Sequence, residues 1–149
     1  MSSASTQQNT STPNAMRPMP SVPVEPAMVT EDPRELVRFL HDEIKLSDRE
    51  LAKALGGTHE VTIRRWRSKK ATGAPRDPQP LDDLRAIVAL LLQSGLLFPE
   101  EIGRYLRSRN QDLAHRRPLD LLGSDDEDAF YRVLEATETL IERMRLPAV

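Results

Sequence analysis

The chain has 149 residues, of which 38% are hydrophobic, 30% charged and 4% aromatic, and its formal net charge is −2. This composition is low in apolar residues for one tightly packed globule and favours a small helical protein with a disordered part. Cysteine is absent, which excludes disulfides, thiolate metal sites, iron–sulfur clusters and a cysteine nucleophile.

The sequence predicts neither a membrane span nor a secretory signal. The most apolar run, residues 86–92, has seven residues, whereas a bilayer-spanning helix needs roughly 20. The opening MSSASTQQNT lacks the basic and apolar regions of a signal peptide. We therefore expect a cytoplasmic protein that does not associate with membranes.

Residues 1–30 are expected to form a disordered tail. They contain five prolines, many Ser and Thr, no aromatic residue and one charge of each sign. Such a segment buries too little apolar area to offset the entropy cost of ordering it. A ligand for a proline-binding module is the alternative for this segment.

Residues 31–70 predict three short helices and no strand. The first helix begins with the Asp-x-x-Glu capping pattern of Asp32 and Glu35, and the proline that follows Asp32 suits the first helical position. A capping box formed by Ser47 and Glu50 begins the second helix. A glycine pair ends this helix, and apolar residues at helical spacing follow it.

The second and third helices fit a helix-turn-helix. This motif needs a small residue where its helices cross, a glycine in the turn and apolar residues that face inward. Ala52 and Gly56 meet the first two requirements, and we expect Thr58 to cap the third helix. The apolar members of the third helix, which runs to about residue 68, are Val61, Ile63 and Trp66.

This segment resembles the Xre-type helix-turn-helix family, whose second helix usually ends in an arginine–tryptophan pair such as Arg65-Trp66. Ile63 lies one position farther from Gly56 than the family spacing, so either the turn contains one extra residue or Gly57 makes it. The side of the third helix that faces DNA stays open among the following candidates: His59, Glu60, Thr62, Arg64 and Arg67.

Local charge favours nucleic acid as the partner of this unit. Six basic residues and no acidic residue lie between Arg64 and Arg76. Phosphate contacts give salt-dependent affinity, and bases are read from the start of the recognition helix. A solvated basic face on a plain three-helix unit is the alternative. The predicted DNA-binding residues are Thr58, His59, Thr62, Arg64, Arg65, Arg67, Lys69 and Lys70.

Beyond a proline-rich linker at residues 71–80, residues 81–146 predict a small helical bundle. One amphipathic helix runs from Leu81 to near Gly95, and Pro99 begins the next. A single turn is expected at residues 119–122, and the last helix at about residues 125–144. The chain is therefore expected to be all-α, with an N-terminal helix-turn-helix unit and a C-terminal bundle.

Residues 105–122 carry a second resemblance, to the toxin-binding domain of the Xre/MbcA/ParS antitoxin family. That family shows an aromatic–leucine pair, a short Asn-containing segment with a leucine, and Arg-Pro-Leu-Asp-Leu-Leu. Tyr105 stands where tryptophan is usual, and Ala114-His115 where the family has glycines. Most motif residues are expected to stabilise the fold, with Asp120 capping a helix or pairing with Arg116 or Arg117. The motif residues are Tyr105, Leu106, Asn110, Leu113, Arg117, Pro118, Leu119, Asp120, Leu121 and Leu122.

This resemblance implies an antitoxin of a type II toxin–antitoxin system. Its C-terminal unit would bind and occlude a RES-type toxin that degrades NAD, and its helix-turn-helix would bind double-stranded operator DNA and repress its own gene pair. The resemblance also implies a homodimer or a larger hetero-oligomer with the toxin. Two alternatives are a solitary regulator of phage, plasmid or chromosomal origin whose C-terminal unit oligomerises, and an inhibitor or adaptor with a vestigial helix-turn-helix.

We expect no catalytic residues, bound metal or cofactor. The three histidines, His41, His59 and His115, make no recognised ligand spacing. Paired acidic residues sit at or near predicted helix starts, where capping and the helix dipole explain them. The glycine pair after the second helix lacks the preceding strand and the Gly-Lys-Ser/Thr of a phosphate loop.

Overall fold

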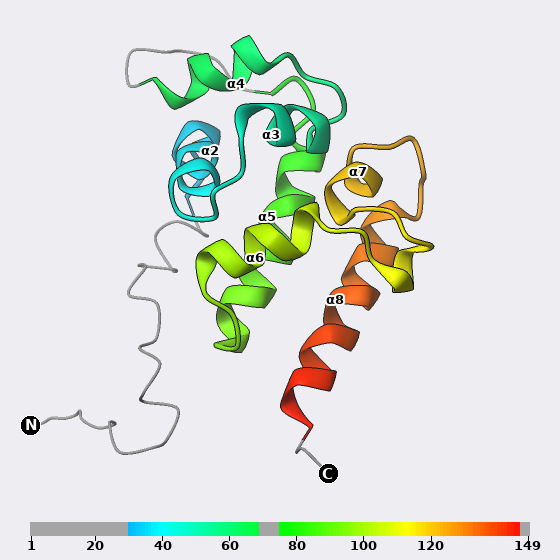
Figure 1. Ribbon diagram of the computed structural model, residues 1–149. Coiled ribbons are helices and arrows are strands. Elements are labelled where there is room, and N and C mark those ends of the chain that lie inside the picture. Colours follow the sequence, from blue (N-terminus) through cyan, green and yellow to red (C-terminus); the bar gives the residue numbers. More distant parts are fainter. Residues whose placement is uncertain (1–29, 69–74, 147–149) are drawn as a thin grey trace, which may run out of the picture.

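The computed structural model describes residues 30–68 and 75–146, and this part of the chain is all-α (Figure 1). The predicted tail up to residue 29 and the predicted DNA contacts Lys69 and Lys70 lie outside the described residues. The elements are α2 (Pro33–Asp42), α3 (Asp48–Ala54), α4 (Glu60–Arg67), α5 (Gln79–Ser94), α6 (Pro99–Arg107), the 3-10 turn η3 (Gln111–Leu113), α7 (Pro118–Leu122) and α8 (Ala129–Arg145).

The capping box predicted for α3 is confirmed, and so is Asp32 as the N-cap of α2, but Glu35 does not complete the predicted pattern, because its carboxylate accepts from the Thr30 hydroxyl and the Asp32 amide donates to Thr30 Oγ1. The Asp32 carboxylate accepts a hydrogen bond of 3.0 Å from the Arg34 amide. In α3 the Glu50 amide donates to Ser47 Oγ (3.0 Å), and the Ser47 amide donates back to the Glu50 carboxylate (2.9 Å). These bonds satisfy amides that the first turn of a helix leaves without partners.

Two other helices begin earlier or later than predicted. α5 begins at Gln79, two residues before the predicted Leu81, because the Asp77 carboxylate accepts from the Gln79 amide at 3.0 Å and starts the helix there. α8 begins at Ala129 rather than near residue 125. The Asp126 carboxylate binds the Asp128 amide (2.8 Å), which holds this acidic segment in a turn before the helix.

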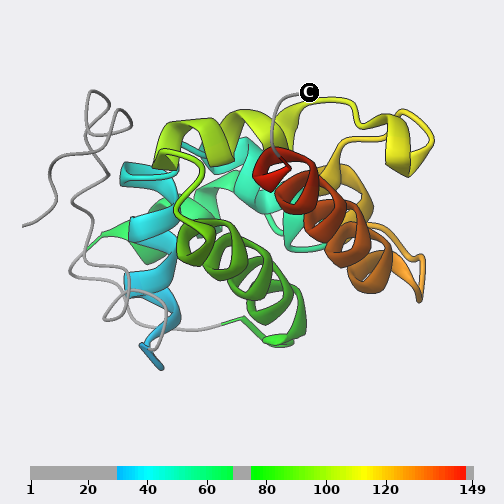
Figure 2. The same cartoon turned by 90° about the horizontal axis from the view of Figure 1, so that it is seen from below.

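The helices form two groups that pack against each other. α2, α3 and α4 contact one another, and α5, α6, α7 and α8 form the second group. Figure 2 shows α5 and α8 side by side as the two long helices of this group, with α2 on the other flank of α5. The predicted turn at residues 119–122 is confirmed as α7, which lies between α3 and α8.

The two groups share one hydrophobic core. Buried leucines, isoleucines and valines from residues 36–66 and 81–141 belong to a single cluster, and α3 contacts both α5 and α7. Two glycines permit this approach. A Cβ at Gly123 would meet the Lys53 carbonyl oxygen, and one at Gly103 would meet that of Ile44, well inside van der Waals contact. The helix-turn-helix is thus packed directly onto the C-terminal helices.

Candidate nucleic-acid interface

The turn between α3 and α4 uses both glycines. Gly56 has φ +81° and Gly57 has φ +88°, in the left-handed region that residues with a Cβ adopt only with strain. Their amides donate to the carbonyls of Lys53 and Ala52, closing the end of α3. Of the two alternatives that the sequence left open, the structure supports the participation of Gly57, which shares the turn with Gly56.

α4 buries one side and exposes the other. Ile63 and Trp66 are buried, as predicted, and α4 contacts α2 and α3. Val61, the third apolar residue of this helix, does not share the buried side, because it is 58% exposed. It lies two positions before Ile63, which turns it to the opposite side of the helix. The exposed residues of this segment are His59, Glu60, Val61, Arg64 and Arg65.

The predicted DNA-contact residues divide between the two flanks of α4. A hollow beside the turn is lined by four of them and also by Arg76. Arg64 lies on the other flank, with its side chain 66% exposed. Thr58 is not the predicted cap, since α4 is preceded by His59 as its N-cap residue and the Thr58 hydroxyl donates to the Leu55 carbonyl (3.4 Å). The four predicted DNA-contact residues that line the hollow are Thr58, His59, Thr62 and Arg65.

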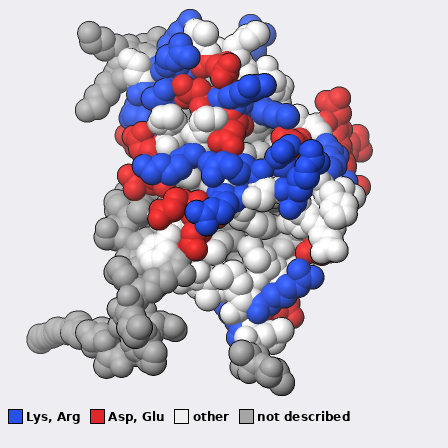
Figure 3. All heavy atoms as spheres, viewed as in Figure 1, with Lys and Arg blue, Asp and Glu red and all other residues white. Residues whose placement is uncertain are grey.

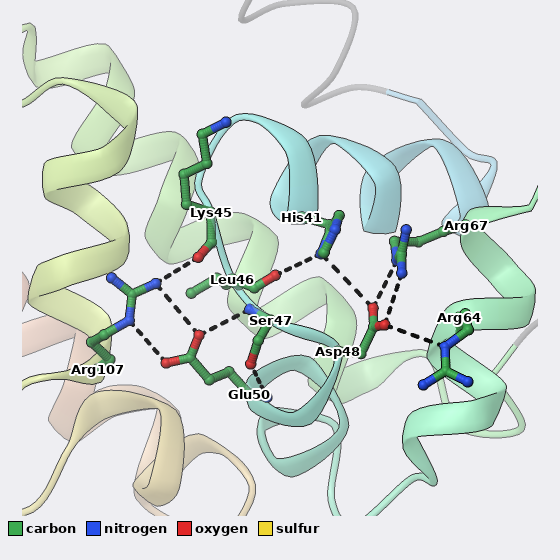
Figure 4. Close-up of polar contacts among 9 residues, drawn as sticks. All are labelled: His41, Lys45, Leu46, Ser47, Asp48, Glu50, Arg64, Arg67 and Arg107. Atoms are coloured by element: carbon green, nitrogen blue, oxygen red, sulfur yellow. Dashed lines mark hydrogen bonds and ion pairs between the residues drawn. The ribbon is translucent and has the colours of Figure 1, made fainter.

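Arg67 has a structural partner within the fold. Its Nε and Nη2 donate to the two oxygens of Asp48 at 2.7 and 2.8 Å, a paired geometry that favours strong binding (Figure 4). Asp48 also lies 3.8 Å from Arg64 Nε and 3.8 Å from His41 Nδ1. The prediction of Arg67 as a DNA contact is therefore modified, because its guanidinium ties the end of α4 to the start of α3.

The Asp48–Arg67 pair makes the free energy of unfolding depend on pH in the acid range. The hydrogen bond from Arg67 holds the pKa of the Asp48 carboxyl below its ordinary value, more than partial burial raises it. The pair stabilises the fold fully above the pKa that Asp48 has in the unfolded chain, about 3.9. This stabilisation is lost as the pH falls through the lower pKa that Asp48 has in the folded protein.

We expect Asp48→Asn to lower the free energy of unfolding at neutral pH by about 1–2 kcal/mol. Urea unfolding across the acid range measures this, and the difference from wild type should vanish in strong acid. Asp82→Asn is the matched control, since Asp82 is 53% exposed in its pair with Arg85, and it should change stability by less than about 0.5 kcal/mol. Equal losses in the two variants would contradict the structural role of Asp48.

A second arginine ties the start of α3 to the C-terminal helices. Arg107 of α6 donates from Nε to the Glu50 carboxylate at 2.9 Å and from Nη2 to the Lys45 carbonyl at 2.6 Å (Figure 4). Burial disfavours the charged form of Glu50, yet the hydrogen bonds from Arg107 and the Ser47 amide lower its pKa overall. The two networks lie on one face around α3.

The predicted partner-binding motif lies mostly inside the fold. Tyr105 is half-buried, its hydroxyl lies 3.0 Å from Thr137 Oγ1, and Asn110 Nδ2 donates to it at 3.4 Å. Burial raises the pKa of the Tyr105 phenol. These bonds hold the segment before α7 against α8, so the motif stabilises the fold, as expected. The buried motif residues are Leu106, Leu113, Pro118, Leu119, Leu121 and Leu122.

The polar part of the motif forms ion pairs, and the segment before α7 contains two residues with left-handed backbones. The predicted pairing of Asp120 with Arg117 is confirmed at 3.5 Å, and Asp120 also pairs with Lys53 of α3 at 3.2 Å. Ala114 and His115 have φ +54° and +64°, the left-handed region in which glycine is favoured.

Across residues 30–68 and 75–146, no helix combines the length and the apolar character needed to cross a bilayer. The same residues contain no group of three or more His, Asp and Glu side chains placed to hold a metal ion. Comparisons of the chain with protein-family models, with curated proteins and with solved structures find no match.

Proposed function

We propose that the chain binds duplex operator DNA through α4 and represses its own gene pair as the antitoxin of a type II toxin–antitoxin system. The observation that supports DNA binding is the arrangement of α3, the double-glycine turn and α4. This arrangement buries Ile63 and Trp66 and leaves two arginines of α4 exposed. A buried inner side and a basic outer side are what a recognition helix needs to enter the major groove.

The outer side of α4 offers chemistry for both backbone and bases. Arg64 and Arg65 can donate to phosphate oxygens or to guanine in the major groove. Val61, exposed among polar neighbours, suits apolar contact with a thymine methyl group. His59 precedes the helix and is exposed, so it lies at the end from which bases are usually read.

The antitoxin part of the proposal rests on the motif at residues 105–122 and its resemblance to the toxin-binding domain. Because the motif leucines are buried, the surface that would occlude a RES-type toxin consists of exposed residues that the motif positions. In this proposal the chain acts in the cytoplasm by binding alone, as a dimer or in a larger complex with the toxin. The alternative function is a solitary regulator that oligomerises, and it is favoured by exposed Tyr131 and Leu146 on and beside α8.

We expect the double variant Arg64→Gln/Arg65→Gln to bind the DNA upstream of its own reading frame at least roughly tenfold more weakly than wild type. Each lost contact removes a charge-assisted hydrogen bond to phosphate or base. Fluorescence anisotropy with that duplex and with a mixed-sequence duplex measures affinity and selectivity. Arg143→Gln/Arg145→Gln at the end of α8 removes the same charge elsewhere, and an equal loss in this control would contradict an interface on α4.

Co-expression with the product of the adjacent gene separates the two functions. Recovery of a stable complex with a RES-domain protein supports the antitoxin function. The RES-domain protein should then lose its NAD-degrading activity in the complex. Retention of DNA binding with no complex formed supports the solitary regulator. Absence of selective DNA binding in wild type would overturn both.

A further inference from the structure

A charged groove lies where the helix-turn-helix meets the C-terminal helices. It runs between α3 and α7, beside the end of α6. Four of its lining residues are basic and two are acidic, and one leucine completes the wall. The lining residues are Arg49, Glu50, Lys53, Arg107, Arg117, Leu119 and Asp120.

The positive charge of this groove is only partly compensated. Glu50 is bound by Arg107, and Asp120 is shared by Lys53 and Arg117. Arg49 makes no ion pair with any residue in the described part of the chain and is exposed. The side chains of Lys53 and Arg117 are 63% and 42% exposed, so their remaining donors are accessible to a ligand.

The groove continues the basic face of the helix-turn-helix. Figure 4 shows Arg64 and Arg67 at one end of the network around α3 and Arg107 and Lys45 at the other. Figure 3 shows many Lys and Arg side chains across this face of the molecule, with Asp and Glu side chains among them. A single extended polyanion can therefore contact α4 and the groove together.

We infer that the groove is a second contact for the phosphate backbone of the same duplex that α4 binds. This inference rests on the proposed function. Arginine presents a planar fork of donors that matches phosphate oxygens, and two of the less constrained cations, Arg49 and Arg117, are arginines. The C-terminal half thus contributes Arg117 to the DNA interface, from a position fixed by the shared core.

An acidic protein segment fits the groove less well than DNA. Protein interfaces obtain most of their affinity from apolar and aromatic anchors seated in desolvated pockets. The one apolar residue in the groove wall is Leu119, which is 2% exposed and already packed in the core. A surface that offers charge with little accessible apolar area matches the backbone of a nucleic acid.

The test compares Arg49→Gln/Arg117→Gln with Arg143→Gln/Arg145→Gln, which carries the same change of charge at the end of α8. Anisotropy with a mixed-sequence duplex gives the slope of log affinity against log salt concentration for each full-length protein. Two lost phosphate contacts should reduce the slope by roughly 1.8 in the groove variant and leave it unchanged in the control. Circular dichroism melting curves check that both variants fold as wild type does.

The outcomes separate the inference from the proposed function. Failure of wild type to bind duplex DNA overturns both. The inference is overturned, and the proposed function is kept, if the salt slope falls in Arg64→Gln/Arg65→Gln but keeps its wild-type value in the groove variant. An equal fall in the control variant also overturns it, because net charge alone would then account for the effect. Wild-type binding of polyglutamate that the groove variant loses, with its DNA slope unchanged, assigns the groove to an acidic protein.

Discussion

Replacing Leu121 by aspartate is expected to abolish the folded state. Leu121 is fully buried in α7, a helix that contacts α3, α6 and α8. The substitution loses the burial of a leucine side chain and places a carboxylate in the hydrophobic core, a combined cost of about 5 kcal/mol or more. Small domains have total stabilities of about 5–15 kcal/mol, so little folded protein should remain.

Circular dichroism and urea unfolding measure this effect, and DNA binding should disappear together with the helical signal. Leu146→Asp is the matched control, because Leu146 is 64% exposed and follows the end of α8. The control should unfold within about 0.5 kcal/mol of wild type. A folded Leu121→Asp protein with unchanged stability would show that α7 is not part of the core.

Gly123→Ala is expected to lower the free energy of unfolding by about 2–3 kcal/mol, a large effect for one added methyl group. Gly123 has φ −88°, so its backbone conformation suits alanine. The added Cβ would however meet the carbonyl oxygen of Lys53 in α3, and backbone atoms cannot move aside as a flexible side chain can. The substitution therefore forces α7 and α3 apart.

Gly57→Ala separates this effect from ordinary backbone strain. Its Cβ would meet no atom within 4 Å, but its φ of +88° disfavours alanine, which should cost about 1 kcal/mol. Chemical unfolding of both variants gives the comparison. If Gly123→Ala proved no less stable than Gly57→Ala, the close packing of α3 on α7 would be disproved.

Local features of the sequence predicted much of the fold correctly. The caps at Asp32 and Ser47 depend on hydrogen bonds that span two or three residues, so the sequence contains all their partners. The buried positions Ile63 and Trp66 follow from helical spacing in the same way. The sequence left open which side of α4 faces DNA, and the packing of α4 on α2 and α3 decides that Arg64 and Arg65 are exposed.

Contacts between distant residues could not be predicted. Asp48 and Arg67 are 19 residues apart, and Glu50 and Arg107 are 57 apart. Nothing in the spacing of these residues indicates that they meet, since the pairing depends on how the helices pack. The helix dipole alone is enough to explain the acidic residues at the start of α3, so the sequence gives no sign that they also bind distant arginines. The groove between α3 and α7 was missed for the same reason.

The glycine-mediated contact of α7 with α3 also limits how such a protein can be divided or recombined. Either fragment taken alone would leave a leucine-rich face open to water, where it would promote aggregation. Gly103 and Gly123 both belong to the C-terminal helices, so a different helix-turn-helix joined to these helices would have to bring its backbone as close to them as the carbonyls of Ile44 and Lys53 lie. The two halves are therefore inherited and engineered most readily as one cassette.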